Sequence, residues 1–110
     1  MALGYTWEKL QTTVQILMGA APLADRLQRA LLEAAVLDRD EGAFPNAELR
    51  ERWRILMDTL THGRPRAEWR ATIDAMSDDD RELAAFEWLS IFVAIDRLDA
   101  ENDASWGRTQ

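Results

Sequence analysis

The sequence predicts an all-α protein, a compact four- to five-helix bundle with a long, mostly buried C-terminal helix. Three observations predict this class. Apolar residues recur with helical spacing over most of the 110 residues. Capping residues, glycines and prolines separate the periodic stretches. The last stretch is apolar almost all the way round through residues 88–95, which requires burial on most sides.

The first two helices are expected to form an antiparallel hairpin. Thr6 is a plausible N-cap for a helix that reaches Met18, and Gly19 is placed to end it. Pro22 suits the first turn of a second helix that ends near Leu37. The apolar side of this second helix is narrow and rich in alanine, so a neighbouring helix can approach it closely.

A loop and a strongly amphipathic third helix are predicted next. Residues 38–45 break the periodicity and indicate the longest internal loop, with Phe44 folded onto the core. Asn46 is a good N-cap for a helix that reaches Thr61. This helix carries the clearest apolar stripe in the chain, which consists of Leu49, Trp53, Leu56, Met57 and Leu60.

Two further helices complete the bundle. Gly63 ends the third helix, and a shorter fourth helix is expected from about Arg66 to Ala75. Ser77 is expected to cap the last helix, roughly Asp78 to Leu98. The three carboxylates of residues 78–80 would then lie at the positive end of the helix dipole, in a variant of the capping box.

Composition indicates one globular domain, residues 1–99, followed by a polar tail, residues 100–110, that we expect to be disordered. Hydrophobic residues make up 47% and charged residues 30%, which is typical of a globular protein. No apolar run approaches the roughly 20 residues of a membrane span, and the N-terminus does not resemble a secretion signal. The absence of cysteine fits a reducing compartment. We therefore expect a cytoplasmic protein without membrane contact.

The net charge of −7 is unevenly distributed. Residues 50–70 carry six arginines against three acidic residues, a balance of +3. These arginines are expected to pair with acidic groups of the same domain or of a sister subunit. An alternative is a patch for anions, nucleic acid or an acidic partner, but an acidic chain repels polyphosphates at long range. The candidate patch consists of Arg50, Arg54, Arg64, Arg66 and Arg70.

Catalytic and metal-binding patterns are not found. His62 follows the third helix, where an imidazole can interact with the negative end of the dipole, and no second ligand lies at metal-binding spacing. Neither a nucleophile elbow nor a phosphate-binding glycine loop occurs. The sequence therefore predicts no enzyme activity, no metal and no cofactor.

The last helix offers a candidate interface. Leu83, Phe86, Leu89 and Val93 suffice to dock it on its own bundle. A second apolar side would then lack an intramolecular partner and could associate with a second copy or with another protein. We predict a homodimer or a complex with another protein through this side, which consists of Trp88, Ile91, Phe92 and Ile95.

Two other functions stay open. Five tryptophans could line a pocket in a small-molecule sensor or regulator. A nucleic-acid binder would use the segment from Arg50 to Arg70. Our leading hypothesis from the sequence is a non-enzymatic protein-interaction or dimerisation module.

Three short stretches carry a resemblance to known proteins. Tyr5-Thr6-Trp7-Glu8-Lys9-Leu10, Leu23-Ala24-Asp25-Arg26-Leu27 and Ala75-Met76-Ser77-Asp78 resemble stretches in small uncharacterised bacterial all-helical proteins. The resemblance extends from Tyr5 to about Leu98 and rests on capping and core residues. It implies a compact helical domain in a bacterial cytoplasm, and it implies no activity or ligand.

Overall fold

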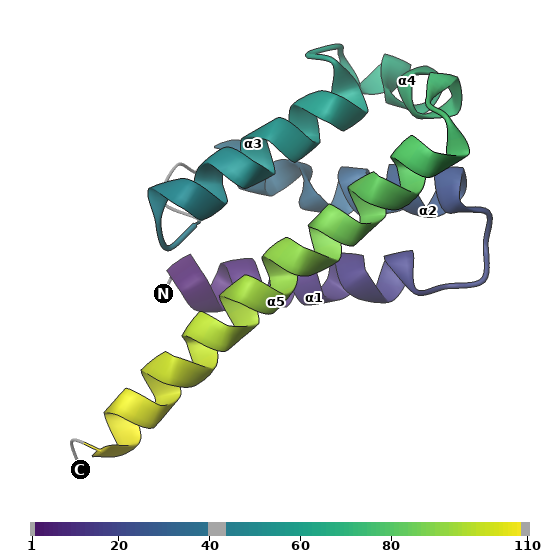
Figure 1. Cartoon of the computed structure of the whole chain (residues 1–110). Coiled ribbons are helices and arrows are strands. Elements are labelled where there is room, and N and C mark those ends of the chain that lie inside the picture. The colour runs from purple at the N-terminus through teal and green to yellow at the C-terminus, as the bar shows by residue number, and fades with distance from the viewer. Residues whose placement is uncertain (1, 40–43, 109–110) are drawn as a thin grey trace.

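The computed structural model describes residues 2–39 and 44–108, and these contain helices and no strand, as the sequence predicts. Helices α1 (Ala2–Leu17) and α2 (Leu23–Ala34) form the predicted hairpin, and the 3-10 turn Ala35–Arg39 extends α2 (Figure 1). Helix α3 (Ala47–Thr61) leads through the 3-10 turn Arg66–Glu68 into α4 (Trp69–Ala75). Helix α5 (Asp78–Arg108) ends the described chain.

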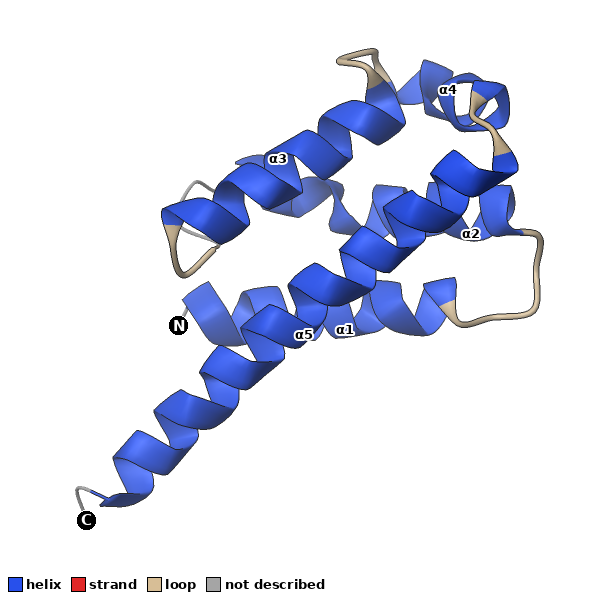
Figure 2. Cartoon of the chain, viewed as in Figure 1, coloured by secondary structure: helices blue, strands red, loops and turns tan. Residues whose placement is uncertain are grey.

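Helix α5 packs across the bundle. It contacts α1, α2 and α3, and its C-terminal end extends beyond them (Figure 2). Trp88, Ile91 and Ile95 of α5 are fully buried, and the Trp88 ring meets the Trp53 ring edge to face at 5.1 Å between centroids. Leu10 of α1 is also fully buried in this core. No described helix combines the length and hydropathy that crossing a membrane requires.

The predicted caps of α3 and α5 are confirmed. The Asn46 side-chain oxygen accepts a hydrogen bond from the Leu49 backbone N–H at 2.8 Å. The Ser77 Oγ accepts one from the Asp80 N–H at 3.1 Å. Each bond satisfies a backbone donor that the first turn of a helix leaves unpaired, and so fixes where the helix begins.

The structure differs from the sequence prediction at both ends of the chain. Thr6 is not an N-cap: α1 already begins at Ala2, and Thr6 lies fully buried inside the helix. Leu3 and Ala2 favour helix, so the helix extends past the expected cap. At the other end α5 continues to Arg108 instead of ending near Leu98, since alanine and glutamate follow and no glycine occurs before Gly107.

The region expected to be the longest loop is described only in part. Residues 40–43 lie outside the described residues, whereas residues 35–39 continue α2 as a 3-10 turn. Phe44 is buried against Trp53, with 5.5 Å between the ring centroids, as the sequence predicts.

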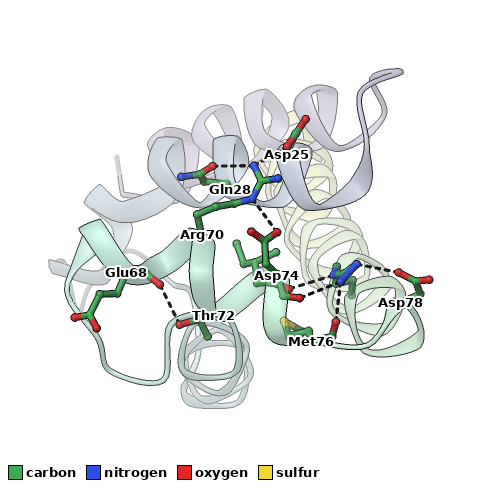
Figure 3. Close-up of polar contacts among 10 residues, drawn as sticks. Asp25, Gln28, Glu68, Arg70, Thr72, Asp74, Met76 and Asp78 are labelled. Carbon is green, nitrogen blue, oxygen red and sulfur yellow. Dashed lines mark hydrogen bonds and ion pairs between the residues drawn. The ribbon is translucent and has the colours of Figure 1, made fainter.

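Arginine side chains fix the corner between α4 and its neighbours (Figure 3). Arg70 of α4 pairs with Asp74 at 2.9 Å and reaches Asp25 of α2 at 2.5 Å. Arg81 of α5 donates to the backbone oxygens of Ile73, Asp74 and Met76, and so satisfies carbonyls at the C-terminal end of α4. The short helix α4 is thereby held against both α2 and the start of α5.

Candidate functional site

A cleft of about 470 Å³ lies where α3, α4 and the first turns of α5 meet. The arginine contacts at the α4–α5 corner hold its walls. Its apolar lining consists of Ile55, Leu56, Ala75, Met76, Leu83 and Ala84. We refer to this hollow as the cleft.

Large apolar side chains remain exposed along the cleft. Leu83 is 66% exposed and Ile55, on the opposite wall, is 52% exposed. Phe86, one turn after Leu83, is 73% exposed and lines a second hollow with Leu83, Asp79 and Glu82. Single exposed apolar residues are ordinary on protein surfaces, but a cluster beside a concave apolar surface is typical of interaction sites.

Hydroxyl groups in the cleft already have backbone partners. Thr59 Oγ1 donates to the Ile55 carbonyl at 2.8 Å, and Thr72 Oγ1 donates to the Glu68 carbonyl at 3.1 Å. The Ser77 Oγ caps α5, as described above. These bonds account for the hydroxyls as structural groups, so the cleft chemistry that remains is apolar contact and charge.

His62 lies at the end of α3 and lines the cleft. It adopts a left-handed backbone conformation with φ of 52°, and its backbone N–H donates to the Asp58 carbonyl at 2.7 Å. Gly63 follows with φ of 68°, which favours glycine. The sequence predicts the helix end here, but nothing in it indicates that the imidazole faces a cleft.

One ion pair beside the cleft joins two of its walls. Arg52 of α3 donates to Glu87 of α5 at 2.6 Å and to Ser90 at 3.0 Å. The hydrogen bond to Glu87 raises the pKa of the Arg52 guanidinium above its ordinary value. This pair fixes the spacing between α3 and α5 and neutralises both charges at the cleft wall.

The two apolar sides of the last helix are the reverse of those predicted. Trp88, Ile91 and Ile95 are fully buried in their own bundle, and Phe92 is half-buried with its ring 6.1 Å from that of Trp7. The side expected to dock the helix is instead open: Leu83, Phe86 and Val93 are exposed, and Leu89 is half-buried.

The side of α5 that faces the core is decided by the polar partner of Trp88. Its indole N–H donates to Thr13 Oγ1 at 2.8 Å, so burial leaves no unpaired donor. The predicted interface of Trp88, Ile91, Phe92 and Ile95 is therefore core, and a second copy would have to meet other residues.

The candidate arginine patch is spread along α3 and beyond its C-terminal end. Arg50 and Arg54 lie in the first half of α3, whereas Arg64 and Arg66 follow its C-terminal end, and 12 residues of helix between positions 50 and 61 span roughly 18 Å. Arg54 pairs with Glu51, and the Arg66 guanidinium lies 5.6 Å from the centre of the Trp69 ring. Arg70 is the interhelical tie described above.

The cleft is not the tryptophan-lined pocket of the alternative hypothesis. Of the four tryptophans whose side chains are described, none lines the cleft: Trp53 and Trp88 lie in the core, and Trp7 and Trp69 are half-buried against the core. The described residues contain no group of three or more His, Asp or Glu side chains that could hold a metal ion.

Comparisons with known proteins returned no match: no family model, no curated protein and no solved structure is significantly similar to this chain. The resemblance to small bacterial helical proteins stays a prediction, and the function is argued from the geometry.

Proposed function

We propose that this protein is a non-enzymatic interaction module and that the cleft receives an α-helix of another protein. The observation that carries the proposal is the exposure of Ile55, Leu83 and Phe86 beside a concave apolar surface. An amphipathic helix that lays its apolar side into such a groove is a recurrent form of recognition.

Burial of the exposed apolar side chains would by itself support only a weak affinity. Fully burying a Leu or Phe side chain contributes about 1.5–3 kcal/mol, and these three side chains still have half or more of that gain available. The three contributions sum to about 3–6 kcal/mol, and the lost translational and rotational freedom costs about 4 kcal/mol or more, so contacts along the rest of the cleft must contribute as well. Because the ion pair of Arg52 with Glu87 holds the walls, little ordering would be needed when a helix binds.

Small-molecule binding is less well supported. The volume of about 470 Å³ lies in the range of ligand pockets. However, the walls at Ile55 and Leu83 face solvent, so a small ligand would stay incompletely covered. Nucleic-acid binding is disfavoured by the pairing of Arg52, Arg54 and Arg70 with carboxylates.

The test uses a designed peptide, because the natural partner is not identified. An 18-residue helical peptide with leucines on one side and glutamines on the other is titrated into ¹⁵N-labelled protein. We expect amide shifts confined to the elements of the cleft. Leu83→Ser with Phe86→Ser should weaken binding at least about tenfold, because two apolar contacts are lost.

The matched control is Val93→Ser, since Val93 is 52% exposed on the same helix but lines neither of the two hollows described above. It should leave the peptide affinity within about twofold. Equal losses for Val93→Ser and the double variant, or shifts on another surface, would refute the proposed site.

A further inference from the structure

Acidic side chains lie beside the apolar contacts at the start of α5. Asp79 and Glu82 line the same hollow as Leu83 and Phe86, and Asp80 lines the cleft itself. We call Asp79, Asp80 and Glu82 the acidic rim. Each is exposed, and no side-chain ion pair joins any of them to a cation of the described residues.

The cations near this rim already have partners. Arg81 pairs with Asp78 at 2.9 Å and donates to the backbone at the end of α4. Arg52 pairs with Glu87. The hollow therefore presents apolar surface together with carboxylates that no side-chain cation of the described residues pairs with.

We propose that the helix bound in the cleft is a basic amphipathic helix, an inference that rests on the proposed function. A lysine or arginine stem can lie along Leu83 and Phe86 while its charged end reaches Asp79 or Glu82. Capping of α5 accounts for acidic residues in its first turn, but Glu82 follows that turn, and the hollow it lines is apolar.

A second copy of this chain fits the site less well. In a symmetric dimer the same patch meets itself, so the acidic rim of each chain would face a surface of the same sign. Like charges brought together at an interface oppose association. A partner with the opposite charge meets no such penalty.

The experiment compares three 18-residue peptides that share one leucine side and carry lysine, glutamine or glutamate on the other. Binding is measured by anisotropy of a labelled peptide at low and high NaCl. We expect the lysine peptide to bind about fivefold more tightly than the glutamine peptide, which is the factor expected for two or three exposed ion pairs. The glutamate peptide should bind most weakly. High salt should reduce the advantage of lysine.

Asp79→Asn with Glu82→Gln tests the rim directly. This variant should lose the preference for lysine and bind the glutamine peptide unchanged. The control Glu8→Gln with Glu101→Gln removes the same charge from exposed positions on α1 and late α5, and it should keep the preference.

The outcomes separate the two proposals. If all three peptides bind equally and Leu83→Ser with Phe86→Ser weakens all of them, the cleft binds helices and the basic partner is refuted. If the lysine peptide binds that apolar variant as well as the wild type, the attraction is non-specific and both proposals fail. If sedimentation shows a dimer that Leu83→Ser dissociates, the occupant is a second copy, and the basic helix is likewise refuted.

Discussion

Replacing Thr13 with valine should destabilise the protein although valine has nearly the same shape. Thr13 and Trp88 are both fully buried, and the Trp88 indole N–H donates to Thr13 Oγ1 at 2.8 Å. Valine fills the space of threonine but accepts no hydrogen bond. The change therefore leaves a buried N–H donor unpaired.

The size of the effect follows from that donor. An unpaired buried polar group costs about 1–3 kcal/mol, so we expect the free energy of unfolding to fall by about 2 kcal/mol. In a domain of about 100 residues each kcal/mol lowers the melting temperature by about 4–8 °C. A fall of about 10 °C is therefore expected. Trp88→Phe removes the donor, so in that background Thr13→Val loses only the bond from Thr13 Oγ1 to the Leu10 carbonyl and should cost about 1 kcal/mol or less.

The assay is urea unfolding followed by circular dichroism, because Trp88→Phe changes the fluorescence signal. Thr12→Val is the matched control: Thr12 is exposed, and its hydroxyl donates only to the Glu8 carbonyl at 3.1 Å. It should change stability by no more than about 0.5 kcal/mol. Equal effects of Thr13→Val in the wild-type and Trp88→Phe backgrounds would mean that the two side chains are not coupled.

Three further predictions test the fold. Ile91→Asp, at a fully buried position, should abolish the helical signal in circular dichroism, whereas Phe86→Asp, at an exposed position, should leave a folded protein. The reverse result would favour the interface that the sequence predicted at Ile91. Gly63→Ala, at φ of 68°, should lower the free energy of unfolding by about 1 kcal/mol, because alanine is strained in this left-handed conformation. Gly4→Ala, inside α1 with open space around it, should raise the free energy of unfolding by about 0.5 kcal/mol. If urea titration gives the two changes the same sign, the backbone argument is contradicted. Asn46→Ala should lower the melting temperature by about 4–8 °C through the loss of a cap worth about 1 kcal/mol, and no shift in calorimetry would mean that the cap bond is absent in solution.

Local signals predicted the elements well where a cap or a clear stripe existed. Asn46 and Ser77 mark helix starts because their side chains bond to backbone donors within three residues, a relation that sequence alone displays. Thr6 has the same chemistry but lies inside α1, where the preceding residues continue the helix. A cap residue thus predicts a helix start only where the chain before it favours another conformation.

The orientation of α5 could not be predicted in this way. Its apolar residues occur almost all round, so the stripe through Trp88, Ile91 and Ile95 and the one through Leu83, Phe86 and Val93 compete equally on hydrophobicity. Partners distant in sequence decide between them. Trp88 finds an acceptor 75 residues away, at Thr13. The cleft was missed for the same reason, because its walls come from separate helices.

The distribution of charge illustrates the same limit. The stretch from Arg50 to Arg70 is basic along the sequence, yet Arg52 pairs with Glu87 and Arg70 with Asp25, so the folded chain neutralises much of it internally. At the start of α5, by contrast, acidic side chains outnumber the cations that pair with them. A run of charged residues therefore indicates a partner only through the charges that are not paired within the chain. Beside the cleft these unpaired charges are negative. That remainder, next to exposed Leu83 and Phe86, is the basis of our proposal that the cleft binds a cationic helix rather than a polyanion.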